Sequence, residues 1–259
     1  MQPHPLALKF VESLRGEAYT WESRPPSPSN ILRCVRQHWF RARKYPMTNP
    51  PEAGAILMMD EGWLVEPKVV DLFTSVGWNA ERKVECDWSW WPGSPGTPDG
   101  VATDEQGTSY IVDAKRLGAW SFSFALADSI REHTPDYYTQ VQLYMKAAGV
   151  ERALIVALCA DYSATNTISK MGSLKGRIAS VLPVIVEEYE YDHTAVEEAC
   201  RRAEYIQWRI ENINDPADVE REYDPFKARF PCGYCAWQDA CKDVSKSVSG
   251  GDAQSGGEV

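Results

Sequence analysis

The 259-residue sequence lacks the segments that would place a protein in a membrane or direct it out of the cell. It contains no run of about 18 apolar residues, so we expect no membrane-spanning helix and no membrane partner. No basic segment followed by an apolar one opens the chain, so we expect no signal peptide. The seven cysteines therefore indicate a cytoplasmic protein, in which thiols serve as metal ligands or core residues instead of disulfides.

Internal repeats and the phosphate-binding pattern G-x-x-x-x-G-K-[ST] are also missing, which excludes a repeat architecture and a P-loop motor. The hydrophobic fraction of 44% and the charged fraction of 25% are ordinary for a globular protein. We expect an N-terminal helical segment, an α/β core, a C-terminal segment with clustered cysteines and a Ser/Gly-rich disordered tail. Their expected bounds are 1–58, 59–191, 192–243 and 244–259.

Acidic side chains are absent from residues 23–51, although the whole chain carries a net charge of −10. Six basic side chains lie in that stretch, so it can present a positive surface to phosphate groups in an otherwise acidic protein. A solvated, charged helix face is the alternative. The candidate nucleic-acid contacts in this stretch are Arg33, Arg36, Arg41, Arg43 and Lys44.

Periodic apolar patterns predict an α/β fold with a mixed central sheet flanked by helices. The turn Asp104-Glu-Gln-Gly107 makes its two flanking strands antiparallel hairpin partners. Residues 27–45 predict a helix capped by Ser27 or Ser29. The remaining expected elements are a loop over 47–55, helices over 60–76, 137–148 and 194–213, and strands over 80–87, 97–103, 109–115, 152–160 and 183–191.

Two acids and a lysine near the hairpin form the first candidate site. Asp99 stands at the start of one strand, and Asp113 and Lys115 lie two residues apart on its partner, where alternate side chains share a face. Carboxylates are the ligands that Mg²⁺ prefers, and a lysine beside them can orient water and offset charge on a phosphate. For the Asp-x-Lys pattern alone, a surface ion pair is the alternative.

A helix downstream adds two polar side chains to this candidate site. Gln140 and Tyr144 are spaced i, i+4, so both lie on one helix face. We therefore expect both to reach the site that holds the lysine.

Three tryptophans within four residues precede a Pro/Gly loop. They are Trp88, Trp90 and Trp91. Exposed aromatic rings can stack on unpaired bases, and Trp90 and Trp91 are the candidates for this contact. The alternative is that these rings cover the edge of the sheet.

Three cysteines near the C-terminus have the spacing C-x₂-C-x₅-C, which is too dense for core packing. They are Cys232, Cys235 and Cys241. A tetrahedral metal site needs a fourth ligand, and the other cysteines are Cys34, Cys86, Cys159 and Cys200. Cys159 lies in an apolar strand and Cys200 in a long helix, so both are interpreted as core thiols. Zinc and an iron–sulfur cluster both fit such ligands.

The Asp99, Asp113-Ala-Lys115 and Gln140-x-x-x-Tyr144 motifs together resemble the core of the PD-(D/E)xK nucleases of the RecB type. Gly62-Trp-Leu-Val-Glu66 is similar to the upstream helix motif of that family. The resemblance implies a restriction-endonuclease-like core that hydrolyses DNA with Mg²⁺ or Mn²⁺. The implied metal ligands are Glu66, Asp99, Asp113 and the backbone carbonyl of Ala114. The resemblance also implies that Lys115 adjoins the attacking water, while Gln140 and Tyr144 position the DNA strand and support the lysine.

Proline follows the upstream ligand directly, which departs from a regular helix. Pro67 removes a helical hydrogen bond and kinks the chain. Either the helix begins again at Pro67, or another acid such as Glu61 takes the place of Glu66.

The segment around Cys34 resembles the first-cysteine segment of the iron–sulfur branch of these nucleases, which has one cysteine before the core and three after it. The spacing brings it nearest to the CRISPR-associated exonuclease "Cas four" family. This likeness implies a [4Fe–4S] cluster on Cys34 and the three C-terminal cysteines, in a helical clasp that joins the two ends of the chain. Zinc is the alternative occupant.

The same likeness implies an exonuclease that acts on single-stranded DNA ends with 5′-to-3′ polarity. It further implies a prokaryotic or virus-infected prokaryotic host, with a recombination or CRISPR-adaptation protein as a candidate partner. A non-catalytic DNA-binding or assembly module on the same fold and a restriction-type endonuclease are the alternatives. The sequence predicts no oligomeric state.

Overall fold

The computed structural model describes residues 5–17, 26–82, 84–161, 182–226 and 231–250 of the chain. The chain divides into two compact units. The sheet unit comprises Ser27–Ile31 and Met59–Arg201, and the terminal unit comprises Met1–Pro26, Leu32–Met58 and Arg202–Val259. Among the helices described, none has the length and apolarity needed to cross a membrane.

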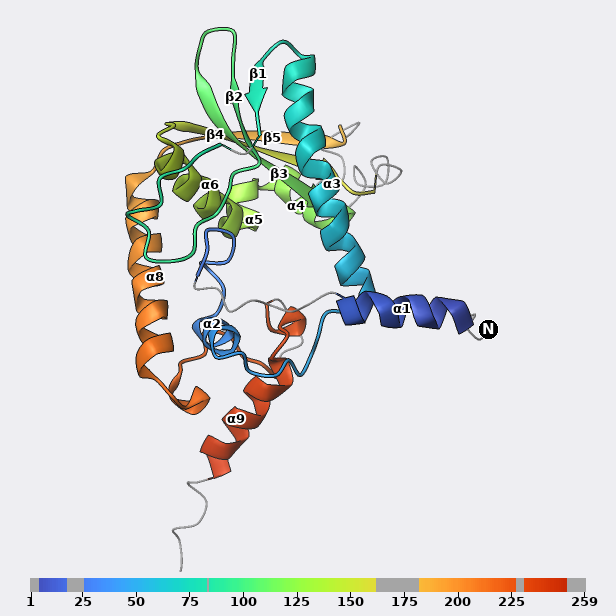
Figure 1. Cartoon of the computed structure of the whole chain (residues 1–259), viewed down its shortest axis with the longest axis vertical. Helices are drawn as coiled ribbons and strands as arrows, with labels where there is room; N and C mark the ends of the chain where they lie inside the picture. The colour runs from blue at the N-terminus through green and yellow to red at the C-terminus, as the bar shows by residue number, and fades with distance from the viewer. Residues whose placement is uncertain (1–4, 18–25, 83, 162–181, 227–230, 251–259) are drawn as a thin grey trace, which may run out of the picture. The chain divides into compact units, whose positions relative to one another are not determined.

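A five-stranded mixed sheet forms the centre of the sheet unit (Figure 1). Its strands, in the order in which they stand side by side, are β1 (Asn79–Glu81), β2 (Gly100–Thr103), β3 (Ser109–Leu117), β4 (Arg152–Cys159) and β5 (Val184–Glu190). All neighbours pair antiparallel except β3 and β4, which pair parallel. The predicted α/β class with a mixed sheet flanked by helices is confirmed.

The two connections of β3 explain why its neighbours run in different directions. Asp104 Oδ1 accepts hydrogen bonds from the N–H groups of Gln106 and Thr108, both at 2.9 Å, and Gly107 takes a left-handed φ of 83° that closes the turn. The predicted β2–β3 hairpin is therefore confirmed. The chain reaches β4 through three helices, as a parallel neighbour requires. They are α4 (Ala119–Ala127), α5 (Ile130–His133) and α6 (Pro135–Ala148).

Helices cover both faces of the sheet (Figure 1). Ile111 of β3 packs in a cluster with Phe122 of α4 and Val141 of α6, all completely buried. The next residue, Val112, points to the opposite face, because side chains alternate along a strand. There it packs with Val69 and Val70 of α3 (Ala53–Ser75). The helix α8 (His193–Asn212) follows β5, close to the predicted bounds of 194–213.

The helix α3 corrects two expectations. It begins at Ala53, so part of the loop predicted over 47–55 is helical. It also passes through Pro67 without starting again there, so the restart that was one of two alternatives for this segment does not occur. The buried Val69 and Val70 that follow anchor the helix on the sheet, and this packing outweighs the hydrogen bond that proline removes.

The N-terminal capping prediction was also wrong. The N–H of Asn30 bonds to the carbonyl of Ser27 at 3.0 Å, and the Asn30 side chain accepts from the N–H of Ser27 at 2.8 Å. This local turn competes with helix formation, so α2 (Val35–Ala42) begins later, with Cys34 at its N-cap. The terminal unit also contains α1 (Pro5–Glu17), which lies in the predicted N-terminal helical segment 1–58, although no bounds were predicted for it.

The C-terminal helix α9 (Gln238–Gly250) enters the segment 244–259 that was predicted to be disordered. Residues 244–250 follow directly on formed helical turns, and extending a helix costs much less than starting one. The rest of the predicted tail lies outside the described residues.

Aromatic side chains from both ends of the chain form the core of the terminal unit. Phe40 of α2 and Trp237 are stacked with their ring centroids 6.3 Å apart. The indole N–H of Trp237 donates to the carbonyl of Tyr45, and that of Trp39 donates to the carbonyl of Ile213, both at 2.8 Å. Each buried indole therefore has a hydrogen-bond partner.

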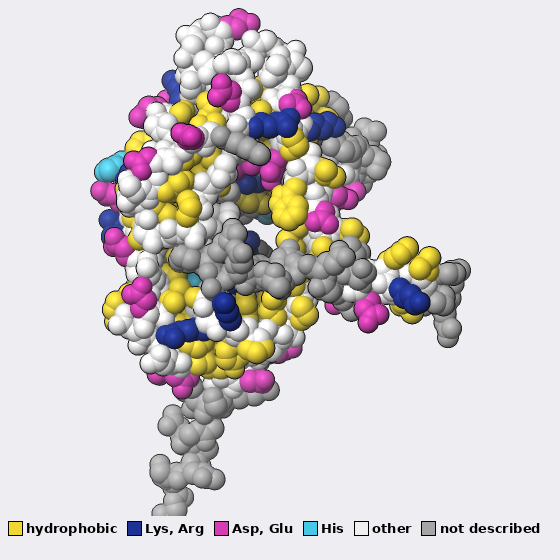
Figure 2. Space-filling model, in the orientation of Figure 1, with side chains coloured by type: hydrophobic (Ala, Val, Ile, Leu, Met, Phe, Trp, Pro, Cys, Tyr) yellow, Lys and Arg dark blue, Asp and Glu magenta, His cyan; other side chains and the backbone are white. Residues whose placement is uncertain are grey.

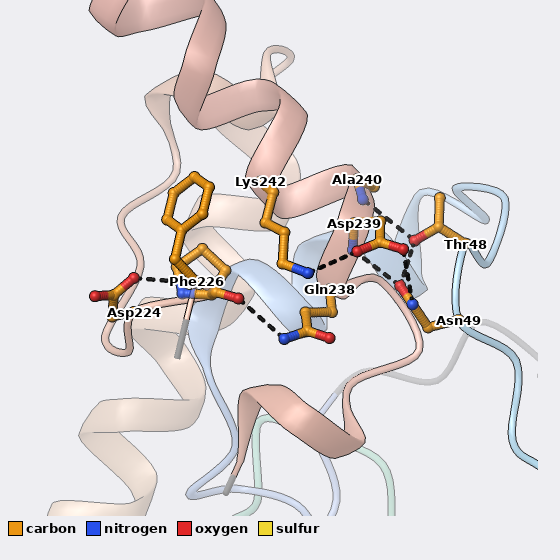
Figure 3. A network of polar contacts seen from close by, with 9 residues as sticks. Thr48, Asn49, Asp224, Phe226, Gln238, Asp239, Ala240 and Lys242 are labelled. Atoms are coloured by element: carbon orange, nitrogen blue, oxygen red, sulfur yellow. Dashed lines mark hydrogen bonds and ion pairs between the residues drawn. The ribbon is translucent and has the colours of Figure 1, made fainter. Parts of the chain in front are cut away.

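A polar network closes the N-terminus of α9 (Figure 3). Asn49 Oδ1 accepts from the N–H of Asp239 at 2.9 Å, and Thr48 Oγ1 accepts from the N–H of Ala240 at 3.2 Å. In return, the backbone N–H groups of Thr48 and Asn49 donate to the carbonyl of Ala236. These bonds satisfy N–H groups that a helix start leaves without intrahelical partners. Residues nearly two hundred positions away thus cap the helix that carries Cys241.

We predict that Asn49→Ala loosens the start of α9. The change removes the acceptor of the Asp239 N–H, which we expect to cost about 1–2 kcal/mol of local stability. Hydrogen exchange measured by mass spectrometry should speed up for peptides that cover residues 238–242. Asn79→Ala, at an exposed position of β1, is the matched control and should leave these peptides unchanged. Equal exchange in both variants would contradict the capping role.

Candidate active site

Two carboxylates meet where β2 and β3 pair. Gly100 is the register partner of Val112, so Asp99 lies beside the start of the Asp113-Ala-Lys115 motif. Asp99 Oδ2 accepts a hydrogen bond from the N–H of Ala114 at 2.7 Å. The Asp113 side chain is 1% exposed. The structure therefore brings the two predicted acids together.

The amine of Lys115 lies against both an acid and an amide. Its Nζ is 2.7 Å from Asp113 Oδ2 and donates a hydrogen bond to Gln140 Oε1 at 3.1 Å. It also stands 4.6 Å from the ring centroid of Tyr137, close enough for a cation–π contact. Tyr137 was not predicted for the site, although it lies three residues before Gln140 on α6 and its helical spacing could have indicated it.

The two motif residues of α6 are linked to each other. Gln140 Nε2 donates to the hydroxyl of Tyr144 at 3.0 Å, and both side chains are buried. The loop before β2 packs closely on this tyrosine, because a Cβ atom at Gly96 would lie 2.8 Å from Tyr144 Cε1. Only a glycine permits that approach without a shift, so the loop holds the ring in place.

The predicted upstream acid, Glu66, lies half-buried on α3. Burial raises the pKa of its carboxyl, Lys115 lowers it and Asp113 raises it, so the three groups interact electrostatically. The alternative ligand, Glu61, instead forms an ion pair with Arg116. This arrangement favours Glu66 over Glu61 as the third carboxylate of the site.

Burial and mutual repulsion perturb the ionisation of the acids. Burial and then the Asp113 charge raise the pKa of Asp99 to about 7, although the Ala114 N–H and the Lys115 cation oppose the shift. Burial also raises the pKa of Asp113 against the influence of Lys115. For Lys115, burial lowers the pKa, but the neighbouring Asp113 and Tyr137 outweigh it and leave the pKa above its usual value. The lysine is therefore a cation at neutral pH.

The carboxylates have the composition of a divalent cation site, although they do not converge as a formed one. Across the described ranges, no three His, Cys, Asp or Glu side chains come close enough to hold a metal. Asp113 Oδ2 lies 2.7 Å from Lys115 Nζ, and the hydrogen bond with that ammonium lowers the pKa of the carboxyl against the effect of burial. Mg²⁺ is often held by only one or two carboxylates with water and substrate oxygens. The pair Asp99 and Asp113 fits that need.

The four cysteines predicted as cluster ligands line one pocket in the terminal unit. They are Cys34, Cys232, Cys235 and Cys241. Burial and the charges of the other three thiols together raise the pKa of Cys235 to about 11, as expected when the four sulfurs are neighbours, although a backbone hydrogen bond with Trp237 opposes the shift. Arg36 Nη1 donates a hydrogen bond to Cys241 Sγ at 3.6 Å. The thiols are thus gathered around one space, although they do not form a closed metal site.

Two of the predicted nucleic-acid contacts are wrong, because their side chains are buried. Arg36 is 6% exposed, and its guanidinium donates to the carbonyl of Val219 within the terminal unit. Trp91 is also 6% exposed, and its indole donates to the carbonyl of Ser94 at 3.0 Å. Both side chains are committed to packing and hydrogen bonding inside the protein, so neither is offered to DNA.

The other candidate contacts keep some exposed surface. Trp90 is partly exposed, and its ring lies 4.1 Å from the Nζ of Lys146. Arg43 and Lys44 are exposed, although Arg43 also bonds to the carbonyls of Ile210 and Ile213. The remaining two, Arg33 and Arg41, are half-buried.

Comparison with known proteins gives a likeness in fold. No protein-family model and no curated protein matches the sequence. Among solved structures, the chain is similar to SSO0001 with a TM-score of 0.50 at 12% identity, over 92% of this chain and 96% of that one. Two structures of LHK-Exo, an alkaline exonuclease from Laribacter hongkongensis, align at 14% identity over 79% of this chain and 92% of theirs. Their TM-scores are 0.49 for the complex with dAMP and 0.45 for the other. At such low identity, the likeness to SSO0001 concerns the fold alone.

The raised pKa of Asp99 predicts a pH-dependent stability of the metal-free protein. Its carboxyl pKa is about 7 in the folded chain against an ordinary value of 3.8. Below pH 3.8 the carboxyl is protonated in both the folded and the unfolded chain and does not disfavour folding. As the pH rises from there through 7, the unfolded chain ionises first, so the folded chain loses stability relative to it. Asp99→Asn removes the charge but keeps an oxygen for the Ala114 N–H. We expect it to raise the free energy of unfolding at about pH 8 by on the order of 1 kcal/mol, and by much less at about pH 4.

Thermal unfolding of metal-free protein at both pH values measures the difference. Asp60→Asn, an exposed acid on α3, is the control and should show no pH-dependent gain. An Asp99→Asn shift of the same size at both pH values would contradict the proposed origin in charge burial.

Proposed function

We propose that the protein is a metal-dependent deoxyribonuclease that hydrolyses phosphodiester bonds, most specifically an exonuclease that acts at DNA ends. The observation that carries this proposal is the contact of Lys115 Nζ with Asp113 Oδ2 at 2.7 Å, beside an Asp99 carboxylate fixed by the N–H of Ala114. A buried acid beside a half-buried acid and a half-buried lysine is costly to assemble, and such groups are concentrated at catalytic sites. The resemblance to PD-(D/E)xK nucleases gives the same residues the same chemistry.

The ligands proposed for Mg²⁺ or Mn²⁺ are Glu66, Asp99, Asp113 and the backbone carbonyl of Ala114. When bound, a divalent metal supplies a Lewis acid for the phosphate and lowers the pKa of water. The protonated Lys115 orients the attacking water and offsets negative charge that develops on the phosphate. It acts as a donor and not as a base, because its pKa is raised.

The residues of α6 act on the lysine. Gln140 accepts a hydrogen bond from Lys115 Nζ and donates to Tyr144, so the three side chains form a chain of contacts. In this proposal Gln140 fixes the direction of the ammonium, and Tyr144 fixes Gln140. The same two side chains are proposed to help position the DNA strand.

The finer substrate assignment rests on the family likeness. We propose single-stranded DNA ends and 5′-to-3′ polarity, with Trp90, Arg33, Arg41, Arg43 and Lys44 as further DNA contacts. A recombination or CRISPR-adaptation protein in a prokaryotic cytoplasm is the proposed partner.

The four-cysteine pocket is proposed to hold a [4Fe–4S] cluster, with zinc as the alternative. Four thiols line this pocket, and burial together with the neighbouring thiols raises the pKa of Cys232 and of Cys235, which supports a shared ligand. The proposed role is structural, because the pocket joins segments from both ends of the chain within the terminal unit.

We predict that Lys115→Met and Asp113→Asn each lower the rate of DNA cleavage by at least about 100-fold, because each removes a charge that the transition state requires. The measurement uses end-labelled linear single-stranded DNA with Mg²⁺ or Mn²⁺, and unfolding curves verify that the variants fold. Lys68→Met, an exposed lysine on α3, is the control and should keep the wild-type rate.

Closed circular DNA separates the enzyme classes in the same assay. An exonuclease leaves closed circular DNA intact. Cleavage of the circles would instead indicate a restriction-type endonuclease. Binding of DNA without metal-dependent cleavage by the wild type would instead favour a non-catalytic module.

We predict an absorbance band at about 400 nm for anaerobically purified protein, with about four irons per chain. Cys34→Ala should abolish both, whereas Cys86→Ala, a thiol outside the pocket, should keep both. A featureless spectrum with one bound zinc would replace the cluster by zinc. Wild-type protein that binds neither metal would overturn the site.

A further inference from the structure

The sheet unit exposes one stack of aromatic rings that the proposed chemistry does not use. Hydrophobic side chains lie on the surface over α3 (Figure 2), where Trp63 is 68% exposed. On α4 and α5, exposed aromatic rings are also stacked in a regular order. Trp120, Phe124 and His133 are stacked one on another there, with Trp120 65% and Phe124 44% exposed.

The stack is built from regular secondary structure. Trp120 and Phe124 are spaced i, i+4 on α4, and their ring centroids are 6.4 Å apart at an interplanar angle of 29°. Phe124 in turn stacks on His133 at 5.2 Å and 23°. Each ring limits the tilt of the next. The outermost indole therefore presents a flat face whose orientation is set before any ligand arrives, which lowers the entropy lost on binding.

The hydrophobic core does not account for these rings. Phe122 and Ala125 of the same helix are 0% and 2% exposed and pack in the core below the sheet. The helix is thus already anchored through its other side. Trp120 and Phe124 stand on the side that faces solvent.

The stack is joined to residues of the candidate active site by short segments of chain on both sides. Trp120 follows Lys115 by only five residues, a span of at most about 18 Å of extended chain. His133 precedes Tyr137 by four residues, and the Tyr137 ring lies 4.6 Å from Lys115 Nζ. The segment that contains the stack therefore begins shortly after Lys115 and ends shortly before Tyr137, whose ring contacts Lys115.

We propose that the Trp120–Phe124–His133 stack binds the bases of single-stranded DNA whose backbone lies at the Lys115 site. This inference rests on the proposed nuclease function. It names the surface of this chain on which the bases of a single-stranded substrate would bind. Every base has a flat π face, so an aromatic platform accepts any sequence, and paired bases are already stacked within a duplex.

The helix that carries Trp120 and Phe124 is itself uncharged. The helix α4 carries no acidic residue, in a chain whose net charge is −10. A phosphate backbone alongside it therefore meets no like charge from that helix. Asp128 and Glu132 follow in the turn and in α5, with Arg131 between them as a cation.

The test compares two oligonucleotides of equal length, oligo(dT) and an abasic strand that keeps only the sugar and phosphate. Fluorescence anisotropy with full-length protein, in buffer without added divalent metal, measures both affinities while cleavage is prevented. We expect Trp120→Ala to weaken oligo(dT) binding by about 5- to 100-fold and to leave abasic binding unchanged. Trp120→Phe should keep most of the affinity. Trp208→Ala, a 51% exposed tryptophan on α8, should change neither value.

The pair of ligands separates stacking from other losses. Equal weakening for both strands would overturn the proposal, because it would indicate a phosphate contact or a damaged fold. Unchanged oligo(dT) affinity would also overturn it and would favour a protein partner for the stack.

A cleavage assay of the wild type with Mn²⁺ keeps the two proposals apart. Cleavage together with a Trp120-independent oligo(dT) affinity overturns the stack alone. A Trp120-dependent preference for oligo(dT) without any cleavage overturns the nuclease alone and supports the stack as a single-strand binding site.

Discussion

The register of the β2–β3 hairpin is the constraint on which the candidate site depends. Because Gly100 pairs with Val112, the Asp99 carboxylate reaches the N–H of Ala114. A slip of one residue would move Asp113 and its lysine neighbour to the opposite face of the sheet, among the apolar side chains. Gly100 also lets α3 approach, since a Cβ there would lie 2.9 Å from Val70 Cγ2 and 2.7 Å from the Glu81 carbonyl oxygen. The helix that carries Glu66 and the hairpin that positions the two acids therefore meet at one glycine.

The electrostatics of the site are unfavourable for folding in the absence of a cation. Two acids with raised pKa values are held beside one ammonium, and burial is the largest cause of both shifts. Ion pairs in such surroundings seldom repay their desolvation. The arrangement is better understood as preorganisation, because Gln140 and Tyr144 hold Lys115 in place through hydrogen bonds that add little to the hydrophobic core. A bound divalent cation would relieve the repulsion that the metal-free site stores.

The terminal unit reaches its structure by different means. Aromatic packing between Phe40 and Trp237 and the cap that Asn49 provides for α9 already join the two ends of the chain. The four thiols line a pocket within this framework. Ordinary packing and hydrogen bonds therefore hold the two ends of the chain together within this unit, which differs from small domains that are unfolded without their ion.

The sequence by itself determined the features that depend on local chemistry. Alternation, turn residues and helical spacing located β2 to β5, α6 and α8, and they placed Asp99 and Asp113 at one hairpin. Tertiary structure decided the features that depend on what packs from elsewhere. Arg36 belongs to a basic stretch, yet it is buried because the Val219 carbonyl accepts its guanidinium. Pro67 stays inside a helix because the sheet holds the residues after it. Neighbours distant in sequence set burial and pairing, and for that reason no local pattern could predict them.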